Sequence, residues 1–113
     1  MKTQIANQNY LSIYEDKIEH LDDRRGLDLT IFLVDDNKVY LKLLEQELSK
    51  NPKYRIYSFL SGEECLEKLY LSPDIAIVDY HLDERNDHAA NGDVILEKIK
   101  AICNHTEVII ISG

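Results

Sequence analysis

Four short runs of apolar residues are spaced along the chain, and polar segments with helical periodicity lie between them. The runs cover residues 29–34, 54–60, 75–78 and 108–111. The first and third are continuously apolar, which is typical of strands buried on both faces, whereas the second is mixed and is predicted to lie nearer a sheet edge. Strands that alternate with helices at this spacing predict an α/β fold with a parallel sheet and right-handed crossovers.

Helix-start signals follow the first two predicted strands. Asn37 is placed to cap one helix, which we expect to end near Asn51. Ser61 and Glu64 form a capping box for the next helix, which we expect to end before Pro73. The predicted inner faces comprise Tyr40, Leu43, Leu44 and Leu48 in the first helix, Cys65, Leu66 and Leu69 in the second, and Ile95, Leu96, Ile99 and Ile102 in the third.

Residues 1–28 have a more polar composition than the rest of the chain. Their larger apolar side chains recur at spacings of three, four and three, which places them on one helical face. These side chains are Leu11, Tyr14, Ile18 and Leu21. Gly26 then reads as the end of the helix. We therefore expect an N-terminal helical extension over residues 1–28 and a single domain over residues 29–113. Such a helix is marginal alone in water, so it must pack on its own domain or on a partner.

The charge and the apolar content narrow the class of protein. The formal net charge of −8 repels phosphate backbones, so direct nucleic-acid binding is not expected. No apolar run approaches the length needed to span a membrane, and the first residues contain no signal-peptide core. Cys65 and Cys103 lack the spacing of metal ligands and fit reduced thiols. We expect a cytoplasmic protein that does not act at a membrane.

Three carboxylates follow predicted strands at the points where those strands end. Asp35 and Asp36 come after the first strand, and Asp79 comes after the third. Neighbouring parallel strands lie roughly 5 Å apart, so the three side chains converge if these strands are adjacent. Like charges in close quarters resist joint ionisation, and a divalent cation removes that conflict. A few oxygen ligands indicate Mg²⁺, although a single aspartate after a strand is also common in turns and helix caps.

Four segments of the chain carry a recognisable order of motifs, and these are residues 31–37, 59–64, 74–82 and 108–113. They comprise a strand with an acidic pair, the turn before the second helix, a strand that ends in an aspartate, and a fourth strand followed by a hydroxyl residue. This order resembles the receiver domains of two-component response regulators, in which the aspartate of the third strand is the phosphoacceptor. The resemblance implies a CheY-like (flavodoxin-like) doubly wound parallel sheet, incomplete at the C-terminus and preceded by the N-terminal extension.

The resemblance also implies a role for each residue of the site. Asp79 is expected to be the phosphoacceptor. Asp36 is expected to ligate Mg²⁺ most directly, with Asp35 beside it and with the backbone carbonyl of His81 as a further ligand. Ser112 is expected to be the switch residue, which donates its hydroxyl to the phosphoryl group. A contact made only in the phosphorylated state can bias a two-state equilibrium.

The sequence departs from the family pattern in two places. Asp83 stands where receivers usually have a proline, and the following loop runs on to Gly92, several residues longer than usual. The family also continues beyond the fourth strand with a helix, a fifth strand that ends in lysine, and a final helix. This sequence has no counterpart of that lysine. Lys38 follows the acidic pair, but we expect it to be solvated.

Three explanations of the second departure are open. We favour a fragment of a longer protein. The alternatives are a natural truncation that dimerises or is inactive, and an N-terminal helix that covers part of the surface left by the missing helix. A homodimer through the N-terminal helix, or through the apolar edge of the fourth strand, is a further expectation.

The leading function is a phosphorylation-controlled signalling module, not an enzyme with an independent substrate. The expected partner is a sensor histidine kinase or a phosphotransfer protein. One alternative is a receiver-like interaction domain that is never phosphorylated. Another is a phosphatase with an aspartate nucleophile, but haloacid-dehalogenase-like enzymes place two aspartates at alternate positions, whereas Asp35 and Asp36 are adjacent.

Overall fold

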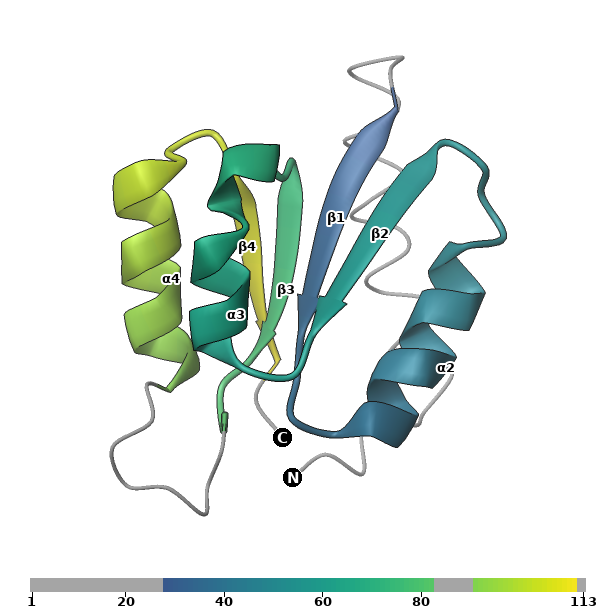
Figure 1. Ribbon diagram of the computed structural model, residues 1–113, viewed down its shortest axis with the longest axis horizontal. Helices are drawn as coiled ribbons and strands as arrows, with labels where there is room; N and C mark the ends of the chain where they lie inside the picture. The colour runs from purple at the N-terminus through teal and green to yellow at the C-terminus, as the bar shows by residue number, and fades with distance from the viewer. Residues whose placement is uncertain (1–27, 83–90, 112–113) are drawn as a thin grey trace.

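The computed structural model describes residues 28–82 and 91–111, and its elements follow the predicted alternation (Figure 1). In chain order they are β1 (Leu29–Val34), α2 (Lys38–Leu48), β2 (Tyr54–Phe59), α3 (Gly62–Glu67), the 3-10 turn η2 (Leu69–Leu71), β3 (Ile75–Asp79), α4 (Gly92–Ile102) and β4 (Glu107–Ile111). The predicted N-terminal helix, the long loop after Asp83 and Ser112 lie outside the described residues. The boundary between the extension and the domain therefore stays a prediction.

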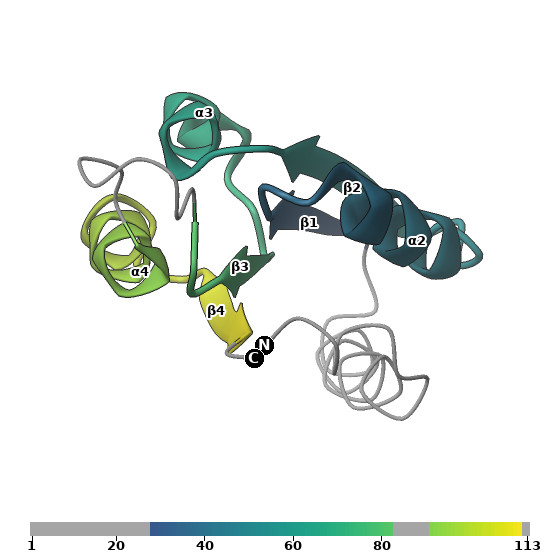
Figure 2. The ribbon, with the colours of Figure 1, turned by 90° about the horizontal axis from the view of Figure 1, so that it is seen from below.

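The four strands form one parallel sheet in the order β2-β1-β3-β4. The chain passes from β1 to β2 on one side and then returns to β3 on the other side of β1. β2 is an edge strand of this sheet, as its mixed composition predicted. Helix α2 lies on one face of the sheet, and α3 and α4 lie on the other (Figure 2). The predicted doubly wound α/β fold is confirmed, and its topological switch point lies between β1 and β3.

Alternate residues of the buried strands enter two separate apolar clusters, one on each face of the sheet. In β1, Ile31 packs toward α2, whereas Phe32 packs toward α3 and α4. Both side chains are fully buried. A strand with apolar residues on both faces has no polar side to turn toward water, which is why the continuous run in the sequence predicted a central strand.

Two of the predicted inner residues point outward instead. Leu43 of α2 is 51% exposed and Ile102 of α4 is 66% exposed. The buried residue of α2 that the prediction missed is Leu41, which lies nearer than Leu43 to the middle of the face formed by Leu44 and Leu48. A helix advances about 100° per residue, so an apolar residue three positions before or after a stripe can fall outside it.

The predicted helix caps are present. The side chain of Asn37 accepts a hydrogen bond from the Tyr40 N–H (3.1 Å) at the start of α2. At α3, the Glu64 N–H donates to Ser61 Oγ (3.2 Å). The Glu64 carboxylate reaches back to the Leu60 N–H (3.2 Å), one residue before the position expected in a capping box. α3 is short and continues into the η2 turn, so the chain leaves the helix well before Pro73.

Replacement of Ser61 by alanine tests the contribution of this cap. We expect a loss of about 0.5–2 kcal/mol in the free energy of unfolding, because one backbone N–H of α3 loses its partner. Urea unfolding followed by circular dichroism measures the loss. The exposed Ser49, at the C-terminal end of α2, provides the control through Ser49→Ala, which should change stability by less than about 0.5 kcal/mol. Equal losses in the two variants would contradict a specific capping role.

The two cysteines, Cys65 in α3 and Cys103 at the end of α4, are buried on the face of the sheet that these helices cover. Burial raises the pKa of the Cys65 thiol to about 12, and the nearby Cys103 adds to this effect. Cys103 Sγ lies 3.6 Å from the Leu69 carbonyl oxygen. The Cys65 thiol therefore behaves as an apolar packing group at neutral pH. Across the described residues, no helix has the length and apolar character needed to cross a membrane.

Candidate metal and phosphoacceptor site

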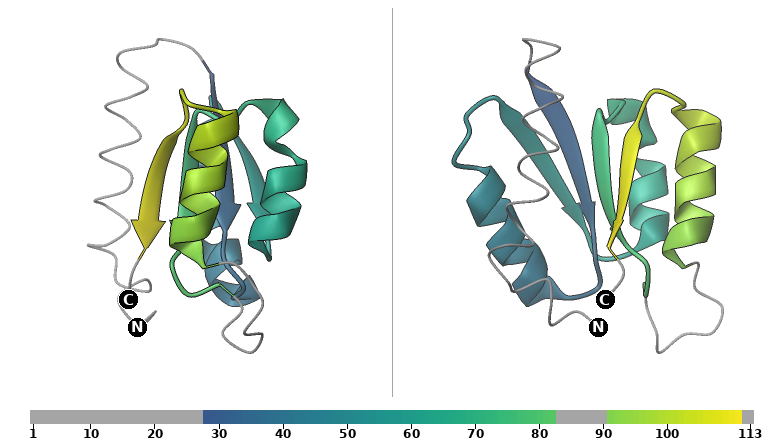
Figure 3. Two further views of the ribbon diagram at one scale, coloured as in Figure 1. Left: turned by 90° about the vertical axis from the view of Figure 1, so that its left-hand side faces the viewer. Right: turned by 180° about the vertical axis from the view of Figure 1, so that it is seen from behind.

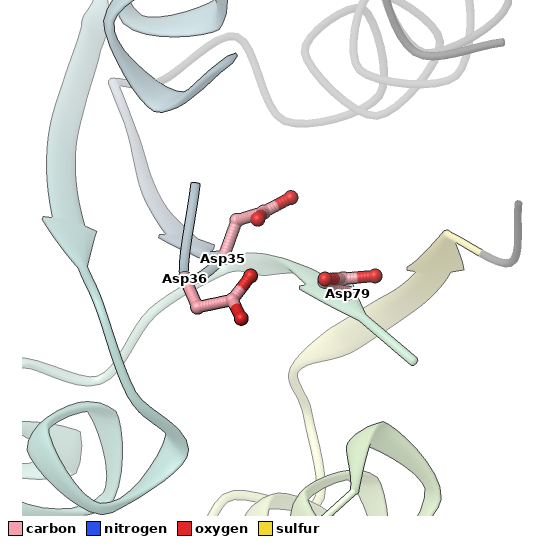
Figure 4. A group of neighbouring side chains, drawn as sticks. All are labelled: Asp35, Asp36 and Asp79. Atoms are coloured by element: carbon pink, nitrogen blue, oxygen red, sulfur yellow. The ribbon is translucent and has the colours of Figure 1, made fainter. Parts of the chain in front are cut away.

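Three aspartates meet at the carboxyl ends of β1 and β3. Asp35 and Asp36 follow β1, and Asp79 is the last residue of β3. Carboxylate oxygens from all three lie within 4.8 Å of one another. Figure 4 shows the three side chains gathered above the ends of the two strands. The convergence predicted from strand adjacency is therefore present, and it lies at the topological switch point where open α/β sheets bind ligands.

Strand register and two short turns hold this arrangement. Val34 of β1 pairs with Val78 of β3, so Asp35 and Asp79 follow at the same level of the sheet. Asp35 Oδ1 accepts a hydrogen bond from the N–H of Asn37 (2.8 Å), and Asp79 Oδ1 accepts one from the N–H of His81 (3.2 Å). Each bond spans two residues, as in an Asx-turn, and orients its carboxylate relative to the backbone.

The burial of these carboxylates makes the site costly without a counter-charge. Asp35 is 2% exposed and Asp79 is 1% exposed, while Asp36 is half-buried. Negative charges removed from water and placed close together resist joint ionisation. A hard divalent cation favours a cluster of carboxylate oxygens, and Mg²⁺ in particular is bound through one or two carboxylates together with water and phosphate oxygens. The donor set, its spacing and its burial therefore fit Mg²⁺.

Receiver domains are among the solved structures that share this architecture. The chain is similar to the BeF3-activated DrrB receiver domain, with 27% identity and a TM-score of 0.64 over 76% of this chain and 67% of that one. It is also similar to a response-regulator receiver domain from Clostridium thermocellum, with 26% identity and a TM-score of 0.65 over 75% and 65% of the two chains. The described residues have the fold of response-regulator receiver domains.

The chain is similar to a third solved structure. The N-terminal domain of a receiver protein from Methanoculleus marisnigri JR1 is 29% identical, with a TM-score of 0.60 over 73% of this chain and 64% of that one. The matched part of this chain thus spans about two thirds of the length of these structures. No protein-family model matches the chain, and no curated protein sequence matches it.

Gly92 contacts the backbone beside the candidate site, and the sequence did not predict this contact. Gly92 is the first residue of α4, and its N–H donates to the Tyr80 carbonyl (2.8 Å). A Cβ at this position would lie 2.6 Å from the carbonyl oxygen of Asp79. Helix α4 therefore begins directly against the backbone of the candidate phosphoacceptor. The only sequence signal was a glycine at the end of a polar loop, which indicates a helix start but no particular neighbour.

The remaining residues predicted near the site are His81, Ser112 and Lys38. His81 lies two residues after Asp79 and is half-buried, but a ligand role for its carbonyl stays a prediction. Ser112 lies outside the described residues, although the carbonyl of the preceding Ile111 accepts a hydrogen bond from the Tyr80 N–H (2.9 Å). This bond brings the end of β4 next to the residues that follow Asp79. Lys38 is exposed at the start of α2, as expected of a solvated lysine.

Proposed function

We propose that this receiver domain accepts a phosphoryl group on Asp79 and that phosphorylation switches its interaction with a partner. The single observation that carries the proposal is the convergence of three carboxylates at the ends of β1 and β3. A structural role alone does not require two buried acidic side chains within reach of a third. The similar DrrB receiver domain was solved in a BeF3-activated form, which supports phosphoryl chemistry at this kind of site.

The positions of the three carboxylates support a direct phosphoryl transfer to Asp79. A carboxylate oxygen of Asp79 attacks the phosphorus of a phosphohistidine, the nitrogen–phosphorus bond breaks, and the imidazole leaves with the bonding electron pair. Asp35 and Asp36 hold the cation, together with Asp79 and the proposed carbonyl of His81. Bound Mg²⁺ offsets the charge of the carboxylates and the phosphoryl oxygens. The turn bond from the His81 N–H orients the Asp79 carboxylate.

The donor in this proposal is a sensor histidine kinase or a phosphotransfer protein. Once Asp79 carries the phosphoryl group, Ser112 donates its hydroxyl to a phosphoryl oxygen. A contact that exists in one state only gives that state a free-energy advantage, which a partner can read. The receiver domain loses the phosphoryl group by hydrolysis of its own acyl phosphate and processes no separate substrate, so we do not class it as an enzyme.

Labelling with acetyl phosphate tests the proposal. With Mg²⁺ present, we expect an increase in intact mass corresponding to one phosphoryl group, stable in acid and lost in mild base, as is typical of an acyl phosphate. Chelation of the metal with EDTA should reduce labelling to background, because the carboxylate cluster would then repel the incoming anion. Beryllofluoride binding under the same conditions provides a second measurement.

If labelling fails, the other results distinguish between the two alternative functions. Absence of both the adduct and beryllofluoride binding would favour a receiver-like interaction domain that is never phosphorylated. Steady release of phosphate from a free phosphorylated metabolite would instead favour a phosphatase.

A further inference from the structure

One half of the α2 face of the sheet is buried without a described helix above it. On this face, β3 presents Ile75 and Ile77, and β4 presents Ile111, each at most 1% exposed. Ile109 of β4 is partly buried on the same face. We call these four side chains the β3–β4 face. Apolar side chains that project from a sheet toward water remain accessible unless a second layer covers them.

Helix α2 covers only the other half of this face, which is formed by β1 and β2. Its main contacts are with β2 and β1. Among the described residues, every helical side chain in the cluster on this face comes from α2. In the right-hand view of Figure 3, no coloured helix lies in front of β3 or β4. Helices α3 and α4 cannot contribute, because they cover the opposite face. The burial of the β3–β4 face therefore needs a covering segment from elsewhere in the chain.

We propose that the β3–β4 face is the docking surface for residues 11–21 of this same chain. Outside the described residues the chain has three segments, which are residues 1–27, 83–90 and 112–113. The last has two residues, and the middle one follows β3 at the opposite end from Ile75. Residues 1–27 are the longest of the three and carry the apolar stripe that had no partner in the sequence. Its members are Leu11, Tyr14, Ile18 and Leu21.

The dimensions agree with this assignment. A helix of 11 residues is about 16 Å long, and a strand of five residues, the length of β3 and β4, also spans about 16 Å. Residues 22–28 then connect the segment to β1, which begins beside β3 in the sheet. Seven residues reach up to about 23 Å when extended, enough to cross the roughly 10 Å between layers and one strand spacing. The docked segment would give the sheet its second layer on this face.

Chemical cross-linking tests the proposal in the full chain. The pair Ile18→Cys and Ile109→Cys places one thiol on the apolar stripe and one on the β3–β4 face. We expect a short bismaleimide to link them within one chain, seen as a single linked peptide pair after digestion and as a monomer on a denaturing gel. The natural cysteines are buried, and cross-linking of the unsubstituted chain measures how much they react.

Two matched pairs control for proximity alone. Val108 and Ile109 are adjacent in β4 but belong to opposite faces of the sheet. Ile18→Cys with Val108→Cys should therefore link at least tenfold more slowly. Asp16 is two residues before Ile18, about 200° away around a helix, so Asp16→Cys with Ile109→Cys should be similarly slow. Equal rates in the three pairs, or no link in the first, would overturn the proposal. A linked dimer would assign the face to a second copy and overturn it as well.

Stability provides a measurement that does not depend on the cysteine variants. We expect Ile18→Asp to lower the urea midpoint of unfolding and to increase hydrogen exchange in β4, because the β3–β4 face loses its cover. Asp16→Asn, on the other side of the same segment, should leave both unchanged. An Ile18→Asp variant with an unshifted midpoint and protected β4 amides would contradict the docking. These readouts do not involve phosphorylation, so they stand whether or not Asp79 is the phosphoacceptor.

Discussion

Asp79→Asn is expected to abolish labelling by acetyl phosphate. The amide oxygen of asparagine carries no formal charge and is a poor nucleophile, so no acyl phosphate forms at this position. The change keeps the shape of the side chain at a site that is 1% exposed. It also removes one of three clustered negative charges, so in the absence of Mg²⁺ the variant should be at least as stable as the unsubstituted chain. Intact mass and thermal unfolding measure the two effects.

The control for this prediction is Asp28→Asn. Asp28 is exposed and directly precedes β1, at the opposite end of the strand from Asp35. The six residues of β1 separate the two ends by about 20 Å. This variant should be labelled at the unsubstituted rate. Persistent labelling of Asp79→Asn would mean that another carboxylate accepts the phosphoryl group, and peptide mapping would show whether it is Asp35 or Asp36.

The convergence of the site residues was predictable because it depends on few facts. The acidic pair follows a strand that the sequence marks as central, and Asp79 follows another strand of the same kind. The mixed run at 54–60 had to occupy an edge, which leaves the two apolar strands free to be neighbours. Once β1 and β3 pair in parallel, the geometry of the sheet places their following residues together. The side-chain roles do not follow from this geometry and remain part of the proposal.

The inaccurate predictions arose where local periodicity competes with three-dimensional packing. Leu43 and Ile102 are apolar and lie three positions from buried residues, so each looks like a member of the inner stripe. Their exposure depends on how far around each helix the sheet reaches, which the sequence does not specify. In the same way, nothing in the residues around Gly92 indicates that a helix would begin against the backbone of Asp79.

Gly92→Ala is expected to damage the site more than the fold. The added Cβ would meet the Asp79 carbonyl oxygen at 2.6 Å and Tyr80 Cα at 2.7 Å. These are backbone atoms at the end of β3, where Asp79 pairs with Ile111 and the Tyr80 N–H bonds to the Ile111 carbonyl, so they cannot rotate away. We expect a loss of about 1–3 kcal/mol in the free energy of unfolding, as for other overpacked sites. Displacement of the nucleophile by about 1 Å should slow labelling about a hundredfold.

Gly62→Ala separates these two effects. Gly62 is the first residue of α3, as Gly92 is of α4, so the two substitutions are matched in chemistry and in helix position. The Cβ added at Gly62 would meet Cδ1 and Cγ1 of the Ile95 side chain, which lie in the core between α3 and α4 and not in the site. We expect a comparable loss of stability with labelling within about threefold of the unsubstituted rate, since no backbone atom of Asp79 is displaced. Urea unfolding measures the loss of stability in each variant, and the labelling rates of both variants are measured in buffer without urea. If both variants slow labelling equally, Gly92 acts through stability alone. If only Gly92→Ala does so, the start of α4 positions the phosphoacceptor.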